Sequence, residues 1–189
     1  MDVLSGVLSA FGLSASAGLN AYVPLLIVSL VARYTNWVQL SPSWDALTSW
    51  WVIGALLVLG TVEFFADKVP AVNHINDLIQ TFVRPTAGAI LFAANTSTVS
   101  EVNPVLAVIA GLLLAGGVHA AKAAAVRPAV TATTGGAGNV LVSIAEDIVA
   151  TVLSILAIVL PVIIAALIVV LTALVVWLLW RRARRLQPV

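Results

Sequence analysis

Long apolar segments separated by short polar ones dominate this chain. They cover residues 3–33, 50–67, 85–98, 104–126 and 139–180. A helix needs about 20 residues to cross a bilayer, so the first segment is longer than one straight crossing. Its small and polar middle, from Ser14 to Asn20, predicts a broken or kinked helix. Small residues on one face of this segment are typical either of close helix packing or of a discontinuous helix at a substrate site: Ser5, Ser9, Gly12 and Ser16.

The last apolar segment, 139–180, contains only two charges, both near its start. Its length fits two crossings that reverse at Pro161. The alternative is a short half-helix followed by one long tilted helix. Polar and small residues of this segment share one helical stripe, which is expected to face protein or a cavity rather than lipid: Asn139, Ser143, Glu146, Ala150 and Ser154.

Two polar segments interrupt the first half of the chain. The Trp-rich stretch from Tyr34 to Trp50 has the composition of an interfacial aromatic belt. Residues 70–84 are too polar to span a membrane, so we expect a short amphipathic helix that lies in the interface. A separate, short third span over 85–98 would follow it. A turn at Glu101 and Asn103 would then lead into the fourth span.

Composition makes a water-soluble fold untenable. The chain has 189 residues, of which 61% are hydrophobic and 9% charged, whereas soluble domains carry about 25% charged residues. We therefore predict an all-α, polytopic transmembrane bundle in a single domain, 1–189. It would have a first half (1–103), a second half (104–180) and a basic tail (181–189).

The same composition narrows the chemistry. Cysteine is absent and only two histidines are present, so disulfides are excluded and no metal site is expected. A net charge of +1 argues against nucleic acid as a partner. The bilayer itself is the one partner that the sequence requires.

Positive charge fixes the expected orientation, because cytoplasmic loops are rich in Lys and Arg. The tail arginines 181, 182, 184 and 185 and the loops near Lys68 and Lys122 would lie inside, and the Trp-rich loop outside. Six crossings with both termini cytoplasmic satisfy every loop. The first three crossings would then run opposite to the last three, as in a 3+3 inverted repeat with broken helices.

Charged residues from three spans would gather in the cytoplasmic half. An ion at the bilayer centre costs about 2.5–3.5 kcal/mol, so these side chains should pair or line a wet cavity. Both a structural network and an ion or anion site remain open. The candidate ligand-binding residues are Glu63, Asp67, Lys68, His119, Lys122, Arg127, Thr134, Gly135, Gly136, Asn139, Ser143, Glu146 and Asp147.

The stretch from His119 to Asp147 is the most specific part of this set. The start of the fifth span at Asn139, after a Thr/Gly turn, would offer free N–H groups to an anion. Lys122 and Arg127 would add positive charge. The carboxylates Glu63, Asp67 and Glu146 would supply counter-charge or a neighbouring cation path.

Three elements of the sequence resemble a known family. They are H-x-x-K at 119–122, T-x-x-T-G-G-x-G-N at 131–139 and S-x-x-E-D at 143–147, preceded by GLNAYVPLL at 18–26 and FADKVPAVNHINDLIQTFVRP at 65–85. The chain is similar to bacterial membrane proteins grouped as domain of unknown function 4126. The resemblance implies an integral protein of the bacterial cytoplasmic membrane and implies no activity. Val140 and Asn73 depart from the family pattern, which often has Pro and Asp there, so a role that needs a carboxylate at 73 is weakened.

Three classes of function remain, and the sequence assigns neither a catalytic residue nor a cofactor. The first is a small transporter or channel-like protein for an ion or small anion. The second is a membrane enzyme or lipid-handling protein that binds a phosphate headgroup with Lys122, Arg127 and the Gly-rich backbone. The third is a structural subunit of a larger membrane complex or a homo-oligomer.

Overall fold

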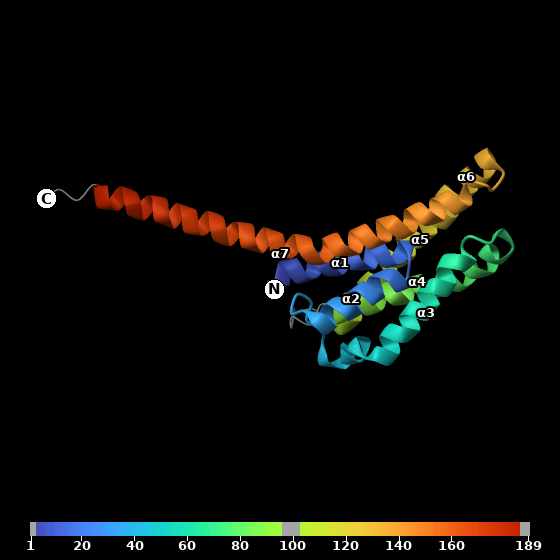
Figure 1. The fold of residues 1–189 in the computed structure, drawn as a ribbon, viewed down its shortest axis with the longest axis horizontal. Helices are drawn as coiled ribbons and strands as arrows, with labels where there is room; N and C mark the ends of the chain where they lie inside the picture. The colour runs from blue at the N-terminus through green and yellow to red at the C-terminus, as the bar shows by residue number, and fades with distance from the viewer. Residues whose placement is uncertain (1–2, 96–102, 186–189) are drawn as a thin grey trace.

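The computed structural model describes residues 3–95 and 103–185, and every regular element in these ranges is helical (Figure 1). This confirms the all-α prediction. The helices are α1 (Val3–Leu19), α2 (Tyr22–Tyr34), α3 (Trp50–Ala66), α4 (Pro70–Asn95), α5 (Pro104–Ala121), α6 (Arg127–Thr134) and α7 (Asn139–Arg185). A 3-10 helix, η1 (Pro42–Thr48), precedes α3, and a π-helical turn, η3 (Lys122–Val126), joins α5 to α6.

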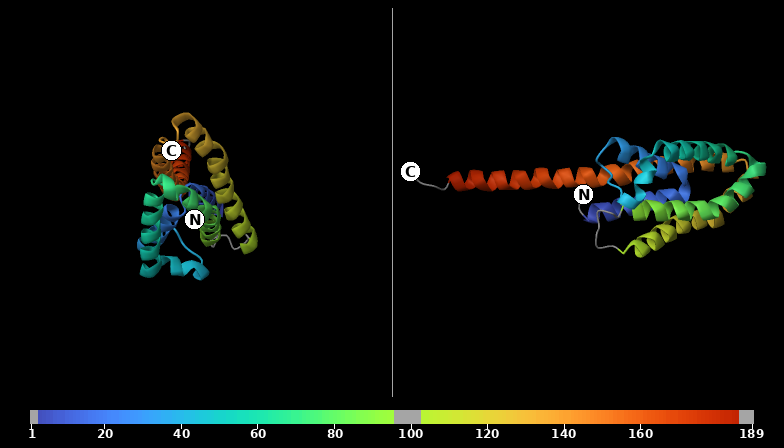
Figure 2. Two further views of the ribbon diagram at one scale, coloured as in Figure 1. Left: turned by 90° about the vertical axis from the view of Figure 1, so that its right-hand side faces the viewer. Right: turned by 90° about the horizontal axis from the view of Figure 1, so that it is seen from below.

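The helices run back and forth along one common axis (Figures 1 and 2). Helix α1 packs against α4, α5 and α7, and its residues Leu13 and Ala17 are fully buried in the main core. One end of the bundle holds the α1–α2 break, the α3–α4 turn and the α6–α7 turn, and we call it the turn end. The opposite end holds the start of α1, the η1 region and the end of α4, and we call it the tryptophan end.

The first apolar segment is two helices that fold back on each other. Helix α1 ends at Leu19 and α2 begins at Tyr22, so the predicted break is confirmed at its C-terminal edge. Asn20 makes the restart possible, because its Oδ1 accepts hydrogen bonds from the N–H groups of Tyr22 (3.1 Å) and Val23 (3.0 Å). The start of α1 and the Trp-rich loop therefore lie at the same end. The prediction that they lie on opposite sides was wrong, because it counted 3–33 as one crossing.

Residues 70–95 form a single helix, so the prediction of an interfacial helix followed by a separate span was wrong. Pro85 lies inside α4 and does not end it. The polar residues Asn76, Gln80 and Arg84, spaced by four, point into the bundle and are buried. These polar side chains therefore face the protein interior rather than the lipid headgroups.

Helix α7 is one uninterrupted helix of 47 residues with Pro161 in its interior. Neither predicted arrangement, two spans or a half-helix plus a long helix, is present. At 1.5 Å per residue it is about 70 Å long, and its C-terminal part projects far past the bundle (Figures 1 and 2). The tail arginines and the basic residues near the turn end, which were expected on one side, consequently lie at opposite ends of the molecule.

The second predicted break, within Thr131–Asn139, is confirmed. Helix α6 ends at Thr134, and α7 begins at Asn139. Between them Gly135 (φ 61°) and Gly136 (φ 91°) adopt left-handed conformations that residues with a side chain rarely accept. The Gly pair therefore allows the tight reversal of the chain.

Small residues let the helices approach closely. Ser16 Oγ donates to the Ala150 carbonyl at 2.7 Å and lies 2.7 Å from Ser154 Oγ, so the small face of α1 packs against α7. Gly88 of α4 faces Gly111 of α5, and a Cβ on either would overlap the other's backbone. This is the close packing that small residues permit in membrane helices.

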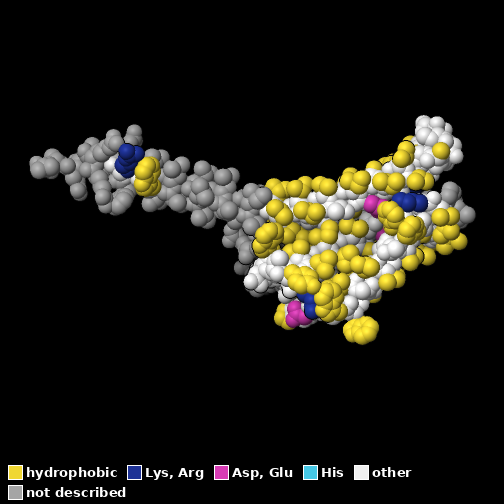
Figure 3. Space-filling model, in the orientation of Figure 1, with side chains coloured by type: hydrophobic (Ala, Val, Ile, Leu, Met, Phe, Trp, Pro, Cys, Tyr) yellow, Lys and Arg dark blue, Asp and Glu magenta, His cyan; other side chains and the backbone are white. Residues whose placement is uncertain are grey.

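The outer surface of the bundle is largely apolar (Figure 3). In the described part of the chain, residues 104–134 and 139–161 are long and apolar enough to cross a membrane. A third candidate combines η1 and α3, which are bent by 62°. Two to three candidate spans indicate a membrane protein.

Candidate functional site

Arg84 of α4 occupies the centre of a buried group of charged side chains and is itself fully buried. Its Nη2 lies 2.9 Å from Glu63 Oε1 and 3.7 Å from Asp67 Oδ2. Its Nη1 lies 3.2 Å from Nδ1 of His119. One guanidinium thus joins α3, α4 and α5, and Glu63 and Asp67, four residues apart, both face it.

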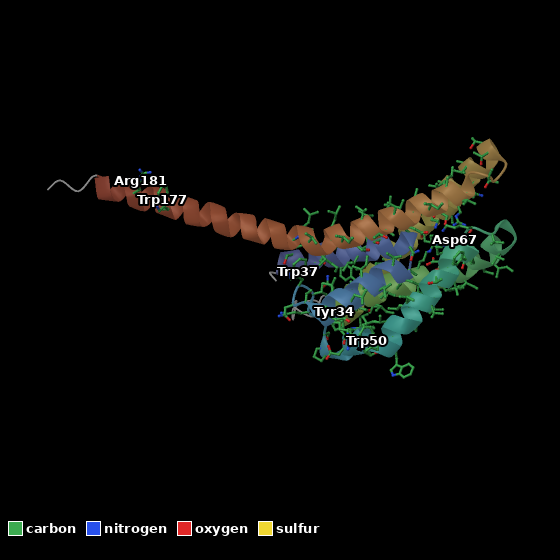
Figure 4. All side chains as sticks on the ribbon, in the orientation of Figure 1. Tyr34, Trp37, Trp50, Asp67, Trp177 and Arg181 are labelled. Atoms are coloured by element: carbon green, nitrogen blue, oxygen red, sulfur yellow. The ribbon has the colours of Figure 1, made fainter. Side chains whose placement is uncertain are left out.

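Asp67, at the C-terminal end of α3, is the most highly coordinated acid (Figure 4). Its Oδ2 accepts from Ser143 Oγ (3.2 Å) and Arg127 Nη2 (3.4 Å), and its Oδ1 accepts from Asn76 Nδ2. Burial alone raises the pKa of this carboxyl, but the charges of Lys122, Arg84 and Arg127 and the Asn76 bond together hold the pKa below its usual value. Asp67 is therefore built to remain ionised.

His119 is held in one tautomer by its neighbours. A guanidinium can only donate hydrogen bonds, so Arg84 donates to Nδ1 and the ring proton resides on Nε2. That Nε2–H then donates to Thr81 Oγ1 at 3.2 Å, and the Thr81 hydroxyl donates to the Asp77 carbonyl at 2.9 Å. The donors form one consistent chain from Arg84 to the backbone of α4.

Lys122 and Arg127 bring the α5–α6 segment into the same group. Lys122 Nζ lies 2.6 Å from Glu146 Oε2 and donates to the Leu19 carbonyl at 3.5 Å, at the C-terminal end of α1, where a positive charge is favourable. Arg127 pairs closely with Asp77 and reaches Glu146 at 4.0 Å. We call the whole group the charge cluster: Glu63, Asp67, Asp77, Arg84, His119, Lys122, Arg127 and Glu146.

Acids outnumber bases in the charge cluster by one, because it contains four carboxylates and three cationic side chains. Each of the three cations is within 4.0 Å of a carboxylate. Among the described residues, three buried carboxylate oxygens make no hydrogen bond, Glu63 Oε2, Asp77 Oδ1 and Glu146 Oε2. Of these, Glu146 Oε2 is in the ion pair with Lys122 Nζ at 2.6 Å. A buried polar atom without a partner is costly, so the arrangement has the charge and the acceptor atoms to take up one positive charge.

A second ion pair, which we call the outer pair, lies on the other side of α7. Lys68 Nζ lies 3.3 Å from Asp147 Oδ2, and Asn20 Nδ2 donates to Asp147 Oδ1 at 2.9 Å. Both charged side chains keep 16–18% of their surface exposed. They meet one end of a cavity of about 650 Å³ between α2, α3 and α7, which we call the lateral groove.

The chain matches the model of the family described as Domain of unknown function (DUF4126) over residues 7–181. It belongs to this family. No curated protein and no solved structure gives a significant match.

In this DUF4126 chain the structure divides the predicted site residues into three sets. Two motifs supply the cluster and the outer pair: H-x-x-K gives His119 and Lys122, and S-x-x-E-D gives Ser143, Glu146 and Asp147. The third motif makes only the α6–α7 turn. Thr134 Oγ1 accepts from Gly138 N (3.0 Å), and Asn139 Nδ2 donates to Thr131 Oγ1 (3.0 Å). In the described part of the chain, the hydrogen bonds of Thr134, Gly136 and Asn139 stay within α6 and this turn and do not reach Lys122 or Arg127.

The sequence reasoning missed residues of α4 and the helix break. Arg84, Asp77 and Asn76 belong to the segment that was assigned to the membrane interface, and Asn20 binds the outer pair. The signal that could have found them is the spacing of Asn76, Gln80 and Arg84, which runs straight into an apolar span. One long helix with a polar stripe beside other charged helices would have placed Arg84 inside.

The carboxylates are not arranged as a metal centre. In residues 3–95 and 103–185, no three His, Asp or Glu side chains come together as the shared ligands of a metal centre. The cluster is instead organised by carboxylate–cation pairs.

Proposed function

We propose that this protein is a small membrane transporter or channel-like protein that binds a proton or a monovalent cation in the charge cluster. The observation that carries the proposal is the excess carboxylate in a buried site, with Glu63 Oε2 unpartnered. Ionisable groups inside membrane helices commonly mark ion pathways.

A cation fits this site better than an anion does. The basic groups of Arg84, Lys122 and Arg127 are already engaged by carboxylates, so an anion would have to displace an acid. The helix start at Asn139, where an anion was expected, makes its bonds within its own turn. A proton or cation at Glu63 would instead supply the missing partner.

The broken α1–α2 segment supports the same function. Helix α1 ends at Leu19 beside Lys122, and in transporters the C-terminal ends of such half-helices coordinate cations. Displacement of Lys122 from Leu19 would expose a carbonyl oxygen next to the carboxylates. The helix break and the adjacent carboxylates therefore support the proposed cation site.

The finer topology belongs to the same proposal. Six passes of the chain, namely α1, α2, α3, α4, α5–α6 and α7, alternate in direction, and we take them as six crossings whose two halves form an inverted repeat. We place the turn end in the cytoplasm, because Lys68, Lys122 and Arg127 gather near it. The tail arginines, at the far end of α7, then lie on the opposite side.

Ion flux into proteoliposomes tests the proposal. Wild-type protein should dissipate an imposed gradient of H⁺, Na⁺ or K⁺, measured with a dye for internal pH or for membrane potential. Glu63→Gln keeps the shape of the side chain but removes its charge, and it should reduce the flux at least tenfold. Asp45→Asn is the matched acid-to-amide control, because Asp45 lies in the exposed η1 helix, and it should conduct like wild type.

Two outcomes would reject the function. The first is absence of flux for all three cations in wild-type vesicles that contain folded protein. The second is wild-type flux in Glu63→Gln. Either result would favour a structural network, in which buried pairs specify packing.

A further inference from the structure

The lateral groove has the size and lining of a site for an apolar chain. Its volume of about 650 Å³ lies in the range of about 300–1,000 Å³ that is usual for ligand sites. The walls are mainly apolar and include Leu26, Leu56, Phe65, Ile148 and Val152. Along α3 it extends from Leu56 to Phe65, or about 13 Å at the helical rise.

One end of the groove is charged and the rest is not (Figure 3). Asp147 lines this end, and Lys68 closes it by contacting two lining residues, Asp147 and Phe64. The ammonium of Lys68 lies 3.2 Å from the Phe64 ring centroid and donates to the Phe64 carbonyl at 2.9 Å. The pair therefore presents one positive and one negative group side by side, at the turn end of the bundle.

The chemistry of the outer pair leaves capacity for a ligand. A lysine ammonium has three N–H donors, and Lys68 directs two of them at Asp147 and the Phe64 carbonyl. Asp147 Oδ1 accepts from Asn20 and Asp147 Oδ2 accepts from Lys68, and each oxygen has a further lone pair. A ligand that brings both an anionic acceptor and a cationic donor would satisfy both residues.

We propose that the lateral groove binds one acyl chain of a zwitterionic phospholipid whose headgroup carries a primary amine, of the phosphatidylethanolamine type. The chain lies along α3 and α7, the phosphate accepts from Lys68, and the headgroup ammonium donates to Asp147. The anionic phosphatidylglycerol headgroup offers Asp147 only neutral hydroxyl donors and brings a net negative charge beside this carboxylate. A quaternary ammonium headgroup has no N–H to donate to this carboxylate.

This site is separate from the cation site proposed above. Neither Lys68 nor Asp147 belongs to the charge cluster, and the groove lies on the α2–α3 side of α7. Lipid binding and ion flux can therefore be measured and can fail independently.

Retention of defined lipids by the purified full chain tests the proposal. Protein in mixed micelles with equal amounts of palmitoyl-oleoyl phosphatidylethanolamine, phosphatidylcholine and phosphatidylglycerol is examined by native mass spectrometry. Phosphatidylethanolamine should be retained about tenfold more than either of the others. Asp147→Asn should abolish its advantage over phosphatidylcholine, and Lys68→Met should lower the retention of all three lipids.

A matched pair of tryptophan variants tests whether the groove itself is the site. Val152 (48% exposed) lines the groove, whereas Ile155 (47% exposed) lies almost one turn further along α7 and outside it. Val152→Trp should reduce phosphatidylethanolamine retention about tenfold, and Ile155→Trp should leave it unchanged. Glu63→Gln should retain the lipid like wild type, which separates this result from that of the flux experiment.

Three results would overturn the proposal. They are retention of phosphatidylglycerol equal to or above that of phosphatidylethanolamine, equal retention by Val152→Trp and Ile155→Trp, or an unchanged lipid preference in Asp147→Asn.

Discussion

At the scale of single residues, Arg84 holds the charge cluster together. It is fully buried and contacts Glu63, Asp67 and His119 on two other helices. Breaking a buried ion pair from one side costs far more than the pair itself contributes, because the remaining charge stays buried without compensation. The stability of the turn end should therefore depend on this one guanidinium.

Arg84→Met should lower the free energy of unfolding by about 3–5 kcal/mol, because Glu63 loses its cationic partner. Arg33→Met is the control, since Arg33 is exposed at the tryptophan end, and it should cost about 1 kcal/mol or less. Equilibrium unfolding in mixed micelles measures both. The double variant Arg84→Met/Glu63→Met should recover part of the loss, and a double variant less stable than Arg84→Met would contradict this account.

Asp67 should make the stability of the fold depend on pH in the acidic range. Its pKa in the fold is held below the ordinary carboxyl value, so its contribution is complete above the unfolded value of about 3.9 and is lost as the pH falls toward the lower folded pKa. Melting temperatures of the wild type should therefore decrease below about pH 4.

Asp67→Asn should be less stable at neutral pH and should lose less on acidification than the wild type. Asp45→Asn, at an exposed acid, should keep the wild-type acid dependence. A melting profile of Asp67→Asn parallel to that of the wild type between pH 6 and 3 would show that this carboxylate does not govern the acid response.

At the scale of helices, periodicity located the elements but not their boundaries. The α1–α2 and α6–α7 breaks could be predicted because small polar residues and glycine weaken a helix at those places. The prediction ended helices at Pro85 and Pro161, because proline usually ends a helix in water. In membrane helices a proline can lie in the interior, because neighbouring helices satisfy the backbone groups that it leaves free. A polar stripe such as that of 76–84 has the same spacing whether it faces headgroups or buried partners. Arg84 could therefore be placed only by recognising that this stripe continues into an apolar span.

The contact between α4 and α5 should tolerate no added methyl group at its closest point. Gly111→Ala places a Cβ against the backbone of Gly88 and should destabilise the protein by about 1–3 kcal/mol through overpacking. Gly117→Ala on the same helix meets nothing within 4 Å and should stabilise it by up to about 1 kcal/mol, the difference in helix propensity. Equal effects on thermal unfolding would show that α4 and α5 are further apart.

At the scale of the whole molecule, the membrane class could be predicted and the path of the chain only partly. The high hydrophobic and low charged content was enough to predict a membrane protein. The path differed because 3–33 makes two passes and 139–180 one, and these two errors cancel in the number of passes. Among the cluster residues, Glu63, Asp67, His119, Lys122, Arg127 and Glu146 were named in advance because charge in an apolar chain is conspicuous. Their mutual geometry depends on α4, which was misplaced.

The topology that we propose puts the tryptophan end and the turn end on opposite sides of the bilayer. The absence of native cysteine allows single-cysteine labelling in intact cells. Ser43→Cys in η1 and Thr133→Cys in α6, both at exposed positions, should react from opposite sides, with Thr133→Cys protected from an impermeant external reagent. Labelling of both from outside would contradict this topology.

Glu146 and Asp147 are consecutive residues of α7, yet they pair with lysines of two different sites, Lys122 and Lys68. Because they belong to one turn of a rigid helix, a rotation of α7 that alters one separation must alter the other. The proposed lipid site and the proposed cation site then share one rigid helix, while the residues that bind each ligand remain distinct. Linkage makes their influence mutual, so any factor by which lipid changes cation affinity would equal the factor by which the cation changes lipid affinity.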